Sequence, residues 1–197
     1  MREYFYFMAS LPTLTPGEPP ALDAAEFLRR ATGVLAPDDL AGAADLLAGR
    51  WDSAPHPFAR RWRPLETQLR NAIARTRTAQ RPAETAFTPH PHEGFDAALE
   101  REAAEALQRK NPLEREQALD RLRWRLVDEL VGVERPFSVE AVMAYALRLG
   151  WAARQAAWQP AAGREQFTAA RDAALPPDFA AAVGAESPPP AEQDGTV

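Results

Sequence analysis

Three histidines are the residues of this chain best suited to metal chemistry, and two of them lie close together. His90-Pro91-His92-Glu93 resembles a metal-binding tract. A zinc site, however, requires three or four well-placed nitrogen, oxygen or sulfur ligands. The pair occurs in a proline-rich stretch, the chain has no cysteine, and no HExxH helix is present. We therefore expect an exposed loop here and no bound metal.

Acidic side chains recur on the predicted helices, and paired carboxylates could in principle carry acid–base chemistry. Glu102 with Glu105 is one such pair, and Glu105 has Arg109 four residues further on. Acid–arginine spacing of this kind is typical of a solvated helical face. A di-iron site would need Glu-x-x-His pairs, and the sequence has none, nor a GxSxG, phosphate-loop or dinucleotide-binding motif. We expect no catalytic residue, no cofactor and no enzymatic activity.

The stretch from Arg50 to Arg81 is strongly basic, with eight arginines against two acids and with Trp51 and Trp62 among them. Arginines interleaved with aromatics could follow a phosphate backbone. Arg70, Arg77 and Arg81, at steps of seven and four, could instead meet an acidic protein partner. A solvated helical surface is the third interpretation, and all three remain open on the sequence alone.

Several aromatic residues fall beside the main apolar stripes of their helices. Trp124 lies off the stripe that runs from Leu119 to Leu130, and Trp151 and Trp158 are two turns apart. Tryptophan and tyrosine in such positions are favoured at interfaces. The alternative is a helix with two buried faces inside a small bundle.

These side chains must be positioned by helices, because apolar residues recur at three- and four-residue steps along most of the chain. Helix starts are clear at Pro37, at Asn111-Pro112 and at Ser138. Pro64 predicts a kink or a restart within the third helix. The expected helices cover about residues 23–31, 37–48, 57–81, 95–110, 112–131, 139–158 and 164–174.

The sequence predicts an all-α protein, an irregular helical bundle of about six to seven helices with a short aromatic N-terminal anchor segment. Periodicity does not decide between helix and strand for residues 4–11. We expect a single helical domain over residues 1–175, with the loop 82–94 inside it. Residues 176–197 hold four acids, no base and a proline run, which predicts a disordered acidic tail.

The composition limits where in the cell the protein is expected to act. The 197 residues carry a formal charge of −5 and no cysteine, which excludes a disulfide-stapled secreted scaffold. The N-terminus does not have the pattern of a signal peptide, and no stretch approaches the roughly 20 apolar residues of a membrane span. We expect a cytoplasmic protein that reaches a membrane only through a partner.

Four motifs, in a fixed order between residues 3 and 170, resemble a family of uncharacterised bacterial proteins. They are Tyr4-x-Tyr6 with Leu11-Pro12, Leu69-Arg70-Asn71 with Arg77, Asn111-Pro112-Leu113-Glu114 with Arg123-Trp124, and Phe137-Ser138 with Tyr145. Genes of that family lie in operons for vacuolar/archaeal-type ATPases. The family is distantly similar to the socket-forming stalk component of those enzymes (C in the archaeal type, d in eukaryotes), although this chain is much shorter.

The resemblance implies a non-catalytic coupling subunit: a central-stalk socket between the rotor ring and the stalk, peripheral at the inner membrane. Its partners would be other ATPase subunits, with no nucleic acid. A transient assembly factor or regulator of the same ATPase is the alternative, and a helical nucleic-acid-binding protein is a third hypothesis. The candidate interface residues are Arg70, Asn71, Arg77, Trp124, Tyr145, Trp151 and Trp158.

Overall fold

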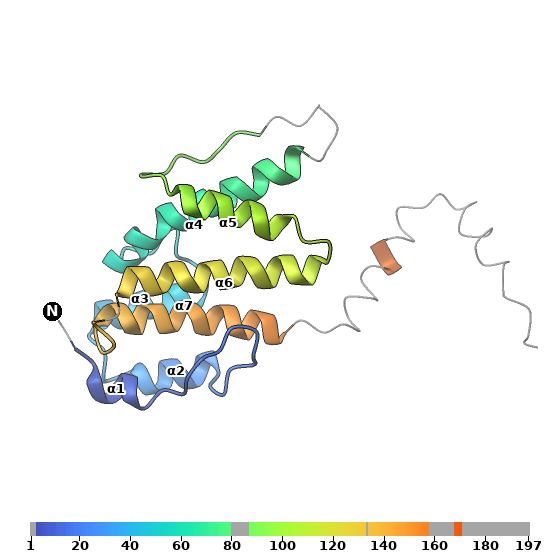
Figure 1. Ribbon diagram of the computed structural model, residues 1–197. Coiled ribbons are helices and arrows are strands. Elements are labelled where there is room, and N and C mark those ends of the chain that lie inside the picture. The colour runs from blue at the N-terminus through green and yellow to red at the C-terminus, as the bar shows by residue number, and fades with distance from the viewer. Residues whose placement is uncertain (1–2, 80–86, 133, 158–167, 171–197) are drawn as a thin grey trace, which may run out of the picture. The chain divides into compact units, whose positions relative to one another are not determined.

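The protein is all-α, as predicted. The computed structural model describes residues 3–79, 87–132, 134–157 and 168–170. Within these ranges the only β-pairing is an isolated bridge between Glu3 and Ser138. The helices, shown in Figure 1, are α1 (Phe5–Ala9), α2 (Ala24–Ala31), α3 (Pro37–Leu47), α4 (Pro57–Ala79), α5 (Ala97–Leu107), α6 (Pro112–Val131) and α7 (Val139–Ala156).

The predicted helix starts are confirmed, and each has a local physical cause. Pro37 and Pro112 occupy the first turns of α3 and α6, where a missing N–H costs no helical hydrogen bond. The side chain of Asn111 accepts a hydrogen bond from the Leu113 amide at 2.9 Å. The Ser138 hydroxyl accepts one from Ala141 at 3.2 Å, and Gly132 ends α6 with a φ of 76°.

Two local details differ from the expectations. Of the kink or restart expected at Pro64, the restart does not occur, because α4 runs unbroken through that residue. The fixed φ of proline is compatible with a helix, and burial of Phe58 and Trp62 before it and Leu69 after it offsets the lost hydrogen bond. Phe95, the first residue of the helix expected at 95–110, instead precedes the N-cap Asp96 and is 71 % exposed.

The aromatic N-terminal segment forms the short helix α1, which decides the choice left open between helix and strand. Phe7 is buried, whereas Tyr6 is 88 % exposed. The segment is held by a 2.7 Å hydrogen bond from the Tyr4 amide to the Phe137 carbonyl. The Tyr4 hydroxyl also donates to Asp39 at 2.5 Å and accepts from the Ala36 amide at 3.1 Å. The anchor is therefore fastened to the starts of both α3 and α7.

α7 is the central helix of the bundle. It packs most extensively against α3, and it also contacts α6 and α2. Nearly every residue from Ala141 to Ala152 is buried, which agrees with the broad apolar surface expected from the sequence. α4 packs on α5 and α6, and Figure 1 shows α6 and α7 lying side by side. This arrangement places α4 and α6 next to each other as the two walls of the site described below.

The chain divides into two units, Met1–Ala157 and Trp158–Val197. All seven helices named above belong to the first. Of the second unit, only residues 168–170 are described, and they are helical, within the segment 164–174 expected to form a short helix. The predicted tail at 176–197 and the segment 80–86 lie outside the described residues. Among the described helices, none is both long and apolar enough to cross a bilayer.

Candidate protein-interaction groove

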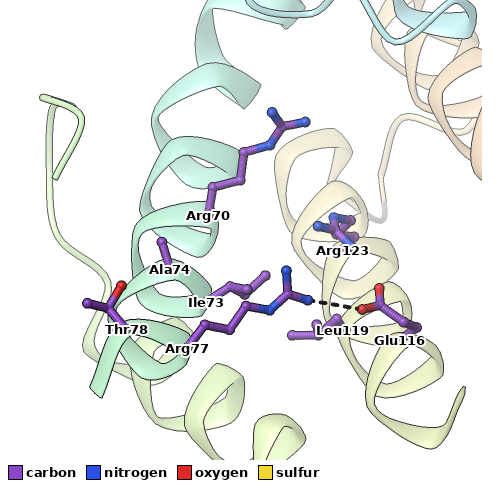
Figure 2. Close-up of a pocket in the computed structure, with 8 residues that line it drawn as sticks. All are labelled: Arg70, Ile73, Ala74, Arg77, Thr78, Glu116, Leu119 and Arg123. Carbon is purple, nitrogen blue, oxygen red and sulfur yellow. Dashed lines mark hydrogen bonds and ion pairs between the residues drawn. The ribbon is translucent and has the colours of Figure 1, made fainter. Parts of the chain in front are cut away.

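A groove of about 520 Å³ lies between α4 and α6. Figure 2 shows its lining side chains, with the α4 and α6 helices as its walls. From α4 come Arg70, Ile73, Ala74, Arg77 and Thr78, and from α6 come Glu116, Leu119 and Arg123. We call this surface the α4–α6 groove.

Helical periodicity explains which residues line it. Arg70, Ile73, Ala74 and Arg77 stand at positions i, i+3, i+4 and i+7, which is one face of a helix. On α6, Glu116, Leu119 and Arg123 have the same kind of spacing. Arg70 and Arg123 share Glu66 as an ion-pair partner, while Arg77 pairs with Glu116, so the two walls run in opposite directions. The groove consequently has an apolar middle and charged ends.

One end of the groove rests on a buried ion network. The Arg123 guanidinium contacts Glu66 at 3.0 Å and Asp120 at 3.0 Å. Glu66 and Asp120 are only 3 % and 1 % exposed. Asp120 also lies 3.6 Å from Arg154 and accepts a hydrogen bond from Gln155. The network joins α4, α6 and α7.

Within this network the charged form of Arg123 is favoured. Burial by itself lowers the pKa of the guanidinium, but the charges of Glu66 and Asp120 and their hydrogen bonds outweigh burial and raise it. Arg123 therefore holds two buried carboxylates in place and cannot turn away without leaving them unpaired. Its position at the end of the groove is fixed before any partner binds.

The two other arginines of the groove are much more exposed. The side chains of Arg70 and Arg77 are 60 % and 62 % accessible. Arg70 bonds Glu66 through Nε at 3.0 Å, and its guanidinium carbon lies 4.6 Å from the centre of the Trp51 ring. Arg77 meets Glu116 at 3.4 Å. Both residues were singled out from the sequence, and the structure brings them together on one surface.

The remaining candidate residues lie elsewhere, and most are buried. Asn71 is 2 % exposed. Its side-chain amide donates a hydrogen bond to the His90 carbonyl at 2.8 Å and accepts one from the His90 backbone N–H at 2.9 Å. Trp124, Tyr145 and Trp151 are 7–8 % exposed. Asn71 therefore holds the loop at 87–94 against α4, and its side chain is not accessible to a partner protein. Trp158 is outside the described residues.

The buried aromatics have specific partners inside the bundle. Trp151 packs on Trp62 with 5.6 Å between ring centres, and Tyr145 stacks on Phe27 at 5.6 Å. The Tyr145 hydroxyl donates to the Pro12 carbonyl at 3.0 Å. Of the two interpretations of these off-stripe aromatics, a second buried face is the one that the geometry supports.

The arginines of the basic stretch are largely engaged within the protein. Each one that the structure describes between residues 50 and 79 has an acceptor. Arg60, Arg61 and Arg63 donate to backbone carbonyls at 3.1, 2.7 and 3.2 Å. Arg50 and Arg75 pair with Asp45 and Glu100, each at 2.9 Å. Arg81 lies outside the described residues. The stretch therefore does not present one uninterrupted row of unpaired cations.

Two of the three histidines, His56 and His90, have partners within the fold. His56 is 8 % exposed, lies 3.5 Å from Asp39 and accepts a hydrogen bond from the Phe58 amide. The backbone of His90 is held by Asn71, as described above. Across residues 3–79, 87–132, 134–157 and 168–170, no three His, Asp or Glu side chains form a group that could hold a metal ion.

Sequence reasoning did not name the residues that build the end of the groove as site residues, although Arg123 belongs to one of the motifs quoted above. Glu66 was visible as one of two acids in the basic stretch, but nothing local links it to Arg123, 57 positions away. Asp120 and Arg123 fall outside the apolar stripe of α6. A usable signal was that both are adjacent to residues of the buried stripe, Leu119 and Leu122, which brings their side chains near the edge of the core.

Comparison with known proteins gives a family match over part of the chain. Residues 96–171 match the profile of a family described as "Protein of unknown function (DUF2764)". The matched segment contains α5, α6 and α7, and with them the α6 wall of the groove, whereas Arg70 and Arg77 precede it. No curated protein and no solved structure matches the chain. The chain is thus similar, over its C-terminal helices, to an uncharacterised family.

Proposed function

We propose that this chain is a non-catalytic, protein-binding subunit of a bacterial rotary ATPase of the vacuolar/archaeal type. In this proposal it acts as the central-stalk socket between rotor ring and stalk, on the cytoplasmic side, and meets the membrane only through partner subunits. The motifs described in the sequence support the choice of complex. The match to an uncharacterised family is compatible with it and adds no functional information.

The observation that carries a protein-binding role is the α4–α6 groove. It combines two exposed arginines with an apolar middle, and its inner end is fixed by the buried network around Arg123. Interfaces are enriched in arginine and depend on apolar contact in the middle of the contact area. A prepositioned surface also lowers the entropy lost on binding.

Purification of the ATPase tests the proposal. A tag on a catalytic subunit would be used to isolate the enzyme from detergent-solubilised membranes of the source bacterium. We expect this chain at a fixed ratio to the rotor subunits. Its absence from an active, fully assembled enzyme would rule the proposal out.

A gene deletion distinguishes a coupling subunit from a transient assembly factor. If the chain transmits torque, ATPase complexes from the deletion strain should hydrolyse ATP without pumping ions. If it acts only in assembly, complexes that do form should pump normally and be fewer in number. The measurement is ion uptake per assembled complex in membrane vesicles.

The groove and its surroundings argue against the nucleic-acid hypothesis. Outside the groove, the described arginines of the basic stretch have intramolecular acceptors, and Glu116 places a negative charge in the groove itself. Electrophoretic mobility of labelled single- and double-stranded nucleic acid at low ionic strength, where electrostatic binding is strongest, is the direct check. We expect no shift.

A further inference from the structure

We propose that the α4–α6 groove binds an acidic amphipathic helix of a partner protein. Its carboxylates, seven residues apart, would pair with Arg70 and Arg77, and apolar side chains between them would cover Ile73 and Ala74. This inference rests on the proposed protein-binding function and specifies the chemistry of the partner.

The spacing on α4 defines the spacing required of the ligand. Arg70 and Arg77 are seven residues apart, and with a rise of 1.5 Å per residue their Cα atoms are separated by about 10.5 Å along the helix axis. Two turns of a second helix span nearly the same distance. A partner helix aligned with the groove therefore presents acids at positions i and i+7 to the two arginines.

The middle of the groove selects apolar side chains. Ile73 and Ala74 are half-buried, and Leu119 is buried below them. Both α4 residues lie between the arginines, at steps of three and four from Arg70. On the partner helix, the residues at i+3 and i+4 face this middle, so they must be apolar to cover it.

The charges exposed along the groove favour an anionic ligand. The two buried carboxylates, Glu66 and Asp120, share Arg123, and each has a second arginine, Arg70 for Glu66 and Arg154 for Asp120. The accessible charges that line the groove are Arg70 and Arg77 against Glu116, which is 42 % exposed. Arg70 uses only Nε toward Glu66, so its two terminal nitrogens have no hydrogen-bond partner among the described residues. Those N–H groups match the two oxygens of a carboxylate.

The existing partner of Arg77 does not block such binding. Its contact with Glu116 is long, at 3.4 Å, and both side chains are exposed. Exposed pairs of this kind contribute little to stability, so exchange of Glu116 for a partner carboxylate costs little. Glu116 also disfavours a phosphate backbone, which has no apolar component to cover Ile73 and Ala74. The combination points to a protein helix.

Photo-cross-linking within the assembled complex identifies the occupant. Thr78, which lines the groove, would be replaced by a photoreactive phenylalanine analogue in the full-length chain, and Arg101, exposed on α5, would carry the same group as a control. We expect Thr78 to capture a helical segment with acids at i and i+7 and apolar residues at i+3 and i+4. Capture of a segment without acidic residues, of nucleic acid, or of nothing contradicts the inference.

Matched arginine variants test the charge contribution. The double variant Arg70→Gln/Arg77→Gln removes both groove cations, whereas Arg75→Gln removes a cation on the same helix that pairs with Glu100 outside the groove. The three side chains are similarly accessible, at 60 %, 62 % and 56 %. Binding to the purified ATPase, or to a peptide of the captured segment, should weaken about tenfold in the double variant and remain unchanged in the control.

The two proposals fail in different ways. If the wild-type chain is absent from the purified ATPase, the proposed function fails, and the cross-linking arm run in whole cells still tests the groove. If the wild-type chain is present but the double variant binds equally well, the inference about the groove fails alone. A thermal melt of each variant excludes loss of fold as the cause of lost binding.

Discussion

At the scale of single residues, the most consequential group is the buried set Glu66, Arg123 and Asp120. Removing one member of a buried ion pair leaves its partner charged and desolvated, which costs more than the intact pair contributes. Without Arg123, Glu66 would still pair with Arg70, and Asp120 would still contact Arg154 and Gln155. The side chains of Arg70 and Arg154, however, are more than half exposed. Arg123 is the only one of the three arginines that is largely buried.

The substitution Arg123→Met tests this assignment. We expect a loss of about 3–5 kcal/mol in the free energy of unfolding, because two buried carboxylates lose their main counter-charge. Urea titration followed by circular dichroism measures it. Arg121→Met is the matched control, since Arg121 is exposed on the same helix and should change stability by less than about 0.5 kcal/mol. Equal stability of the two variants would contradict the role given to Arg123.

Tyr145 predicts a dependence of stability on alkaline pH. Burial raises the pKa of its hydroxyl from 10.0 to about 12, although the positive charge of Arg30 acts in the opposite direction. The folded state therefore retains the proton in a range where the unfolded state loses it. The stabilisation is complete below pH 10.0 and is lost as the pH rises toward about 12.

Comparison with Tyr145→Phe isolates this effect. The variant lacks the hydrogen bond to Pro12 and should be less stable at neutral pH by about 0.5–1.5 kcal/mol. It should, however, lose less stability than the wild type as the pH rises above 10. Urea unfolding at a series of alkaline pH values gives both slopes, and parallel slopes would show that Tyr145 does not contribute.

At the scale of the helices, the contact of α7 with α3 is the most extensive among the helices described. A Cβ atom added at Gly150 would lie 2.6 Å from the backbone carbonyl oxygen of Leu47, closer than real Cβ contacts. Glycine in a helix interior normally costs about 0.5–1 kcal/mol relative to alanine. Here glycine is required because a backbone atom occupies the space that a side chain would need.

The substitution Gly150→Ala should therefore lower the stability of the protein, although alanine has a higher helix propensity than glycine. We expect the intact protein to be destabilised by about 1–3 kcal/mol, the range for overpacking a well-packed core. Thermal unfolding measures the loss. A peptide of residues 138–157 carrying the same change should instead gain helicity, which separates the propensity of α7 from its packing. A stabilised protein would mean that α3 and α7 can move apart at low cost.

The attachment of α1 is a second feature at this scale, and Tyr4 and Tyr6 form a natural pair to test it. Tyr4→Phe removes two hydrogen bonds that hold the anchor to α3, and we expect a loss of about 1–3 kcal/mol. Tyr6 is 88 % exposed, so Tyr6→Phe should leave stability unchanged. Chemical denaturation of both variants is the measurement. Similar effects would show that the Tyr4 hydroxyl is not an anchor point.

At the scale of the whole molecule, the buried core is assembled from the seven helices. Its large buried side chains extend from Phe7 to Trp151, and all of them belong to the unit Met1–Ala157. The groove is part of the same unit. The surface proposed to bind a partner is therefore built on helices that share this core.

A chain truncated after Ala157 tests whether this unit is sufficient. We expect it to unfold cooperatively, with a midpoint within a few degrees of the full-length protein, because it retains the core described above. Differential scanning calorimetry of both forms provides the comparison. A truncated form that fails to fold would show that residues 158–197 supply part of the core, and the predicted domain limit at 175 would then be the better one.

The features that the sequence alone determined are local. Helix starts at Pro37, Asn111 and Ser138 follow from capping and from the geometry of proline, and both act within one turn. The all-α class follows from the three- and four-residue recurrence of apolar side chains. Even the pair Arg70 and Arg77 could be found, since seven residues are two turns of one helix. Local rules were weaker where burial competes with them, as the continuous helix at Pro64 shows. Apolar periodicity also placed Phe95 on the buried face of α5, whereas it lies before the N-cap and is exposed.

Only the tertiary structure decided which faces meet. Whether Trp124 and Trp151 face a partner or a neighbouring helix depends on the positions of α6 and α7, and the structure buries both. The pairing of Glu66 with Arg123 joins residues 57 positions apart, and no periodic pattern encodes it. Backbone hydrogen bonds and caps act over a few residues, whereas helix packing is settled by the fit of side chains across the whole bundle. That fit places Arg70 and Arg77 of α4 beside α6, so that they become part of one wall of the α4–α6 groove.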